Sequence, residues 1–307
     1  MSIDILQSLG EVLIQVLVPI ILMVAAGFIL QRKVNLDARS INRVVYYVLS
    51  PCLVYSSILT QQFDPDSTGR SLLFAALHML IIGLLAYLLA RHWGYEGRLT
   101  SAFIIAAILM NNGNYGLPLN LFAFGDVGFI YALALFMFNA MIGGAISIYL
   151  ALRGQSNAIT ALQRTLVQPI ILAMILGIFS RTTHIAPTGS LQDMIEMAGR
   201  AAIPIFLLVL GMSLAQTDIR ANLRPALNLT ALRMVISPII ALALASVVGL
   251  SGVAYSVAIM QASMPTAVNS IVITNEFDVA PDFTASAVLT TTLTSLITLP
   301  ILLLFLR

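Results

Sequence analysis

Runs of apolar residues, each long enough to cross a membrane, alternate with short polar breaks along almost the whole chain. A helix that crosses the hydrocarbon core of a bilayer needs about 20 apolar residues. The apolar runs, separated by charged residues or by Gly and Pro, predict ten such helices. These are expected at residues 11–31, 39–60, 70–92, 97–124, 127–152, 160–181, 189–214, 222–249, 252–276 and 281–306. The longest polar connection, around Arg153 to Arg164, separates the first five helices from the last five.

Composition excludes an ordinary soluble protein. Apolar residues make up 59% of the chain and charged residues 9%, against roughly 45–50% and about 25% in soluble domains. Ten spans leave no room for a separate soluble domain in 307 residues. The net charge of +2 favours no nucleic-acid partner. Cys52 is the only cysteine, so an internal disulfide and a cysteine metal cluster are excluded.

The distribution of Lys and Arg predicts the orientation, because cytoplasmic loops are enriched in both. Nine of these residues lie on the side that would be cytoplasmic if the N-terminus is outside: Arg32, Lys33, Arg39, Arg91, Arg98, Arg153, Arg164, Arg220 and Arg224. Four lie on the other side: Arg70, Arg181, Arg200 and Arg307. We therefore expect a multi-pass protein of the cell (inner) membrane with both termini outside, and Asp64, Asp66 and Arg70 in an external loop. The first apolar run is long enough to span, so it is not read as a cleavable signal.

The two sets of five helices resemble one another. Four ordered pairs match at offsets of 150 to 153: Pro19 with Pro169, Gly27 with Gly177, Pro51 with Pro204, and Phe124-Gly125-Asp126-Val127 with Glu276-Phe277-Asp278-Val279. Five crossings is an odd number, so the second copy would enter the membrane from the opposite side. The sequence thus predicts inverted repeats over residues 1–155 and 156–307, with chance similarity between Leu/Ile-rich helices as the alternative.

The fourth and ninth spans contain residues that do not suit a regular helix. Residues 109–118 read LMNNGNYGLP, and residues 261–269 read QASMPTAVN. Asn, Gly and Pro at this density predict that both helices break near mid-membrane, where irregular backbone is tolerated only inside protein or beside a wet cavity. Broken helices at matching positions of inverted halves point to a transport site, although a lone Pro kink is the ordinary alternative. The candidate binding residues are Asn111, Asn112, Gly113, Asn114, Gln261, Pro265, Thr266 and Asn269.

Arg233 and His78 are ionisable residues that lie well inside predicted spans. Arg233 is about 12 Å into the eighth span and is expected either to bind a carboxylate or polar partner or to reach back to the interface. His78 in the third span is a candidate proton carrier or a hydrogen-bonded structural residue. Asn139, Thr291 and Thr294 offer neutral oxygens for Na⁺, or serve in ordinary helix packing.

These motifs resemble the auxin efflux carrier family, which includes plant PIN carriers and bacterial malate and malonate permeases. The resemblance covers essentially the whole chain and rests on Ile41-Asn42-Arg43 with Pro51, Asn112-Gly113-Asn114 with Gly116-Leu117-Pro118, Arg233 before Pro238, and Gln261-Ala262 with Met264-Pro265 and Glu276-Phe277. The long cytoplasmic loop of many plant members is absent, so the chain is similar to a compact prokaryotic member. Plant members carry a Pro just before the first Asn of the break, where this chain has Met110.

The resemblance implies a fold like that of sodium/proton antiporters and bile-acid symporters, with crossing helices four and nine. Helices 1, 2, 6 and 7 would form a scaffold, and helices 3–5 and 8–10 a mobile transport domain. Family members carry small organic anions such as auxin, malate and malonate, and a homodimer is expected on the same basis.

The leading hypothesis is therefore a secondary transporter of a small organic anion that works by elevator-type alternating access in the lipid bilayer. A sodium-coupled organic-anion symporter is the alternative, and no cofactor other than a coupling Na⁺ or H⁺ is expected. A cation/proton antiporter is disfavoured because Asp126, Glu276, Asp278 and Asp282 all fall at predicted helix ends. An intramembrane enzyme is disfavoured because no paired carboxylates, clustered His or Ser beside His lies within a span.

Overall fold

All regular structure in the described part of the chain is helical. The computed structural model describes residues 12–152, 158–216 and 222–306. Within them, seven helical stretches are long and apolar enough to cross a membrane, or eight if one bent pair counts as a single span. Two shorter apolar helices, α6 (Gly97–Ile108) and α14 (Gly252–Ala262), accompany them. The predicted multi-span, all-helical membrane protein is confirmed.

The α-helices are interrupted in several places by short π-helical turns, labelled η. The elements are η1 (Val12–Leu17), α2 (Val18–Ile29), η2 (Leu30–Val34), α3 (Ala38–Val44), η3 (Val45–Leu49), α4 (Ser50–Thr60), α5 (Pro65–His92), α6, η4 (Asn112–Gly116), α7 (Leu117–Phe138), η5 (Asn139–Gly143), α8 (Gly144–Ala151), α9 (Ala158–Leu166), α10 (Pro169–Thr183), α11 (Ser190–Gln216), α12 (Leu223–Ala231), η6 (Leu232–Ile236), α13 (Ser237–Val247), α14, α15 (Val268–Glu276) and α16 (Pro281–Leu306).

Helix α5 begins earlier than the sequence suggested. Asp64 caps its N-terminus by accepting a hydrogen bond from the backbone N–H of Ser67 at 2.9 Å, and Pro65 occupies the first turn. Hydrogen bonds from the hydroxyl and backbone N–H of Ser67 hold the pKa of the Asp64 carboxyl below its usual value. Asp66 and Arg70, predicted to lie in a loop, therefore belong to the helix and form an ion pair at 3.1 Å.

The predicted connection between the two halves is partly helical. Its second part forms α9, which is bent by 68° from α10. Gln168 is extended at the bend and Pro169 starts the new helix, so the residue before the proline cannot continue a helix cheaply. The span predicted at residues 160–181 is therefore a bent pair of helices in the structure. Arg153, Arg220 and Arg307, which entered the charge count, lie outside the described residues.

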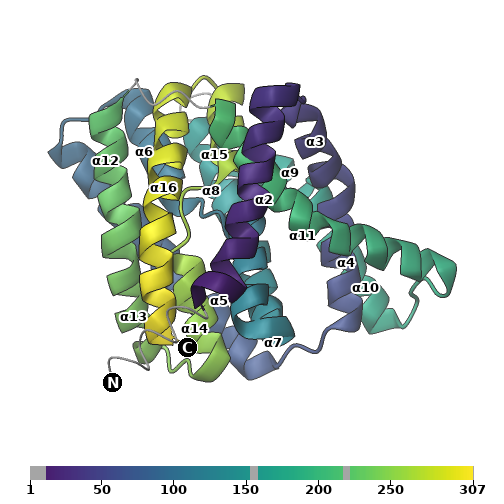
Figure 1. The fold of residues 1–307 in the computed structure, drawn as a ribbon. Helices are drawn as coiled ribbons and strands as arrows, with labels where there is room; N and C mark the ends of the chain where they lie inside the picture. Colours follow the sequence, from purple (N-terminus) through teal and green to yellow (C-terminus); the bar gives the residue numbers. More distant parts are fainter. Residues whose placement is uncertain (1–11, 153–157, 217–221, 307) are drawn as a thin grey trace.

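The helices form two groups. Figure 1 shows α3, α4, α10 and α11 on the right and α12, α13 and α16 on the left, with α2 between them. Helix α11 packs against α2 and α4, and α4 also packs against α10. On the other side α12 packs against α16, and α14 packs against α7 and α13.

Glycines allow α2 and α11 to cross with their backbones in contact. A Cβ at Gly27 would lie 2.1 Å from the carbonyl oxygen of Leu208, and one at Gly211 would lie 1.9 Å from that of Val24. Small residues at such crossings are how membrane helices achieve close packing. Gly177 of α10 allows a similar close approach to α4, where an added Cβ would lie 3.2 Å from the side chain of Ile58.

Replacing Gly211 by Ala should destabilise the protein, because the added methyl group forces α2 and α11 apart. Overpacking of this kind costs about 1–3 kcal/mol, so the melting temperature in detergent should fall. Gly69→Ala is the matched control, since Gly69 lies on α5 with nothing within 4 Å of the added methyl. Equal melting temperatures for the two variants would contradict the backbone contact.

Candidate functional site

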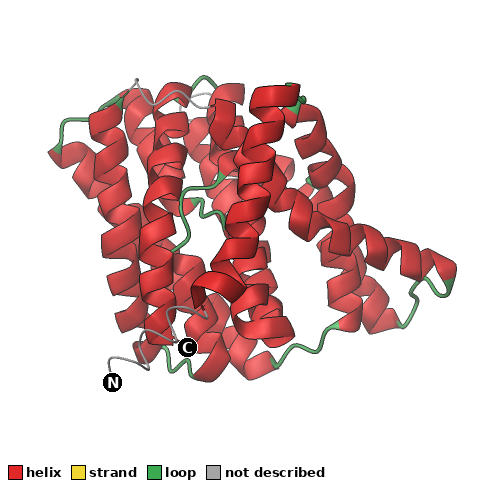
Figure 2. Cartoon of the chain, in the orientation of Figure 1, coloured by secondary structure: helices red, strands yellow, loops and turns green. Residues whose placement is uncertain are grey.

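Two helices break in the middle of the molecule, and the two breaks pair with each other. Helix α6 ends at Ile108 and α14 at Ala262, and helical structure resumes at Asn112 and Val268. Figure 2 shows the intervening loop segments inside the helix bundle, away from the loops at its edges. Both breaks were predicted, although the first is shorter than the predicted stretch. Pro118 ends up in the first turn of α7, where its missing N–H is tolerated.

Backbone hydrogen bonds join the breaks like a minimal antiparallel ladder. Met110 and Thr266 form an isolated antiparallel bridge. The N–H of Asn111 donates to the carbonyl of Pro265 at 2.8 Å, and the N–H of Ala267 donates to the carbonyl of Leu109 at 2.9 Å. Each break therefore supplies partners for polar groups that lipid could not satisfy.

Side chains satisfy several of the remaining backbone groups. The Asn139 amide donates to the carbonyl of Ile108 at 2.9 Å. The backbone N–H of Thr266 donates to the hydroxyl oxygen of Thr291 at 3.1 Å, and the Thr266 hydroxyl donates to the carbonyl of Ala106 at 2.9 Å. The side chains of Asn139, Thr266 and Thr291 therefore form hydrogen bonds with backbone groups at or next to the breaks.

Arg233 belongs to η6, and its side chain reaches the C-terminal end of α14. It is fully buried, with 0% of its surface exposed. Its guanidinium donates to the carbonyls of Ala262 at 3.1 Å and Met264 at 2.5 Å. These carbonyls form the negative end of a half-helix dipole. Among the described residues Arg233 forms no ion pair with a carboxylate. The crossing thus contains a buried positive charge balanced only by dipoles.

A chain of hydrogen bonds connects Arg233 to His78. Arg233 Nη1 donates to the Ser237 hydroxyl oxygen at 3.1 Å, and that hydroxyl donates to the carbonyl of Ala262 at 2.8 Å. His78 Nε2 lies 3.0 Å from the same hydroxyl, and its ring stacks on Phe74 with centroids 5.7 Å apart. Sequence reasoning missed Ser237, which lies one helical turn after Arg233 and before Pro238; that spacing was the available signal.

A small cavity lies beside the paired breaks. Its polar lining residues are His78, Asn112, Asn139 and Gln261. The rest of the lining is apolar and comprises Phe74, Ala75, Met110, Leu135, Phe138, Ala258 and Ala262. A site with a few polar groups in an apolar wall is typical of small-molecule binding.

Several buried amide atoms at the crossing have no hydrogen-bond partner within the protein. They are Nδ2 of Asn111, Oδ1 of Asn112 and Oε1 of Gln261. The Gln261 amide nitrogen, in contrast, donates to the carbonyl of Ala132 at 3.0 Å. Because buried polar groups are normally paired, these atoms are available to a polar ligand. Gly116 makes room for Gln261, since a Cβ there would lie 2.1 Å from Oε1.

The structure brings together most of the residues predicted to bind substrate. Asn111, Asn112, Gly113, Gln261, Pro265 and Thr266 are all buried at the crossing. Asn114 is half-buried, whereas Asn269 is exposed near the start of α15 and does not line the cavity. Thr294 donates to the carbonyl of Thr290 at 2.8 Å, as is usual for a helical threonine.

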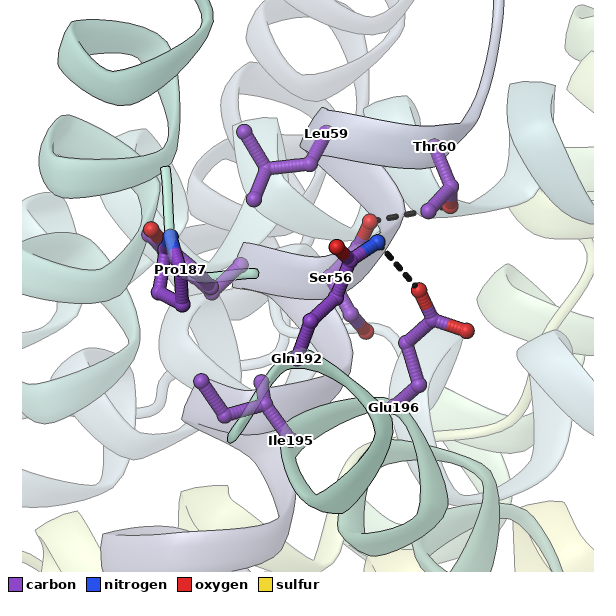
Figure 3. Close-up of a pocket in the computed structure, with 8 residues that line it drawn as sticks. Ser56, Leu59, Thr60, Pro187, Gln192, Ile195 and Glu196 are labelled. Atoms are coloured by element: carbon purple, nitrogen blue, oxygen red, sulfur yellow. Dashed lines mark hydrogen bonds between the residues drawn. The ribbon is translucent and has the colours of Figure 1, made fainter. Parts of the chain in front are cut away.

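A second hollow lies between α4 and α11. Figure 3 shows Gln192 directed at Glu196, and Thr60 bonded to the backbone of Ser56. Because these polar groups already pair with one another, this hollow offers a ligand less than the crossing does. Within the described residues, no group of three or more His, Cys, Asp or Glu could hold a metal ion.

Comparisons with known proteins agree with a transport role. Residues 153–303 match the family model described as membrane transport protein. An uncharacterized transporter of Methanothermobacter thermautotrophicus is 28% identical over 290 residues, which cover 92% of this chain and 94% of the relative. An uncharacterized transporter of Methanocaldococcus jannaschii is 23% identical over 272 residues, covering 85% and 87% of the two chains.

The family resemblance drawn from the motifs is thereby confirmed, and the protein is a multi-span membrane transporter. Residues 153–303, the second half of the chain, thus match the membrane transport protein family, which is the family of the auxin efflux carriers.

Proposed function

We propose that the protein is a secondary transporter of a small organic anion, which binds beside the paired breaks. The observation that carries this proposal is Arg233, a buried guanidinium whose positive charge has no acidic partner in the described part of the chain. Arginine stays charged in proteins, and a buried charge is costly unless it is compensated. An anion in the neighbouring cavity would supply the missing counter-charge.

The cavity favours a cargo with a polar head and an apolar body. Asn112 and Gln261 supply amide groups, whereas Phe74 and Phe138 supply aromatic walls. A carboxylate would accept hydrogen bonds from the free Asn111 amide. The N-terminal ends of η4 and α15 add positive dipole ends at the crossing.

An elevator-type movement fits the origin of the lining residues. All of them come from α5, η4 and the break before it, α7, η5 and α14. These elements belong to the helices that the family resemblance assigns to a mobile transport domain. A bound molecule would therefore travel with that domain past a scaffold built around α2, α4, α10 and α11.

The inverted ten-span scheme gains support from the glycine contacts. Gly27 packs against Leu208, and Gly177 packs against Ile58. Both members of the second contact lie 150 positions from their counterparts in the first. Gly125, at a positive φ of 65°, divides the stretch from Asn112 to Ala151 into two. With each broken helix and the bent pair α9–α10 counted as one span, the described residues are compatible with ten crossings. The Lys and Arg count favours both termini outside.

A sodium-coupled anion symporter is the second candidate. The unpartnered oxygens of Asn112, Gln261 and Thr292 favour it, because neutral oxygens are ligands for hard cations. Sodium dependence of anion binding separates this candidate from the first.

A thermal-shift screen of the purified protein in detergent tests the proposal. Malate, malonate and indole-3-acetate should be compared with choline, each with and without Na⁺. A ligand at 100 times its Kd stabilises the folded state by about 2.7 kcal/mol, so at least one acid should raise the melting temperature. Stabilisation by choline alone, or by none of the acids, would overturn the proposal. Stabilisation by an acid only in Na⁺ would favour the symporter.

Arg233→Gln should weaken binding of the stabilising acid at least about tenfold, which corresponds to about 1.4 kcal/mol. The variant loses the positive charge, whereas Arg233→Lys keeps it and should bind within a few-fold of wild type. Arg224→Gln is the matched control, because Arg224 is exposed at the start of the same span. If the Arg233→Gln and Arg224→Gln variants bind the acid with equal affinity, Arg233 does not contribute to anion binding.

A further inference from the structure

We propose that His78 takes up a proton when the anion binds, so that anion and proton cross the membrane together. This inference rests on the proposed function and adds the coupling ion to it. It stands on three features of the structure: the hydrogen bonds of the His78 ring, its place in the cavity wall, and the charges that face it.

Hydrogen bonding fixes which ring nitrogen can change its protonation. The Ser237 hydroxyl has one proton, which it donates to the carbonyl of Ala262 at 2.8 Å. Its oxygen accepts a bond from Arg233, which can only donate. The remaining lone pair faces Nε2 of His78 at 3.0 Å, so this nitrogen carries a hydrogen and donates it. The lone pair that can bind a further proton is therefore on Nδ1.

The ring lies where it can respond to a ligand. His78 is 1% exposed and forms part of the cavity wall with Asn112, Asn139 and Gln261. The same wall contains the unpartnered oxygens of Asn112 and Gln261. A molecule held by these amides would lie beside the imidazole.

Arg233 is the one charged group among the described residues that face His78. The other residues around His78 are neutral. They are Phe74 and Ala75 of α5, Met110 of the first break, Asn112 of η4, Leu135 and Phe138 of α7, Asn139 of η5, Ser237 of α13, and Ala258, Gln261 and Ala262 of α14. A proton on Nδ1 would add a second positive charge to a network that already holds one. A bound anion offsets that charge, so proton and anion each favour binding of the other.

The coupling needs no further reactant. Nδ1 forms an N–H bond with a proton from the solution on the side to which the site is open. It returns that proton to the solution on the other side when the anion leaves. No electron is transferred. A proton gradient could then drive movement of the anion, since a loaded site carries both.

Proton uptake on anion binding can be counted directly in weakly buffered detergent solution with a pH-indicator dye. The probes are malate, malonate and indole-3-acetate at about pH 7.5, well above the ordinary pKa of a carboxylic acid. Wild type should take up about one proton per anion bound. His78→Gln keeps an N–H donor for Ser237 but has no titrating nitrogen, so it should take up none. His92→Gln, which changes an exposed histidine at the end of the same helix, should behave as wild type.

Each outcome decides between the hypotheses. Wild type that binds an anion without taking up a proton would overturn the inference and leave the proposed anion transporter intact. Proton uptake by His78→Gln equal to that of wild type would do the same, and His78→Asn serves as a second variant if the first does not fold. If none of the three acids binds wild type, the proposed function itself fails.

Discussion

The structure depends on one constraint, which is that backbone N–H and C=O groups released inside a membrane must find partners within the protein. Two helices stop in mid-span, and lipid offers their ends no hydrogen bonds. The chain meets this requirement by crossing the two breaks, so that Asn111 donates to Pro265 and Ala267 donates to Leu109. Because each break depends on the other, the two halves of the chain are joined at their least helical points.

Charge at the crossing follows from the same requirement. The carbonyls at the end of α14 form a negative dipole end, and Arg233 donates hydrogen bonds to them. Solving the backbone problem with an ionised side chain leaves a positive charge buried beside a cavity. The end of α6 is instead satisfied by the neutral amide of Asn139. This asymmetry between the two breaks leaves a buried positive charge beside only one of them.

Much of the fold could be predicted from the sequence, because bulk apolarity and run length follow directly from the thickness of the bilayer. The positions of both breaks were also predictable, since Asn-Asn-Gly-Asn and Met-Pro-Thr are poor helix formers. Their pairing was not, because hydrogen bonds between residues as far apart as Asn111 and Pro265 leave no local signal. The start of α5 at Pro65 was missed for a different reason: the prediction followed apolarity and ignored the local start signal of Asp64 and Pro65.

Individual site residues were harder to predict. The sequence placed Asn112 and Asn269 in one class, yet one lines the cavity and the other is exposed. Side-chain direction in a break depends on how the backbone turns after it, which composition does not reveal. For Arg233, the sequence left open whether the side chain reaches the membrane interface or stays at depth. In the structure the side chain is fully buried and donates hydrogen bonds to two backbone carbonyls.

The most direct measurement would locate a bound anion in a crystal of the wild-type protein grown with 4-bromobenzoate, whose bromine gives an anomalous diffraction signal. The account predicts a bromine peak in the cavity beside Asn112 and Gln261, with the carboxylate directed toward the paired breaks. A peak in the hollow between α4 and α11, with none at the crossing, would contradict it.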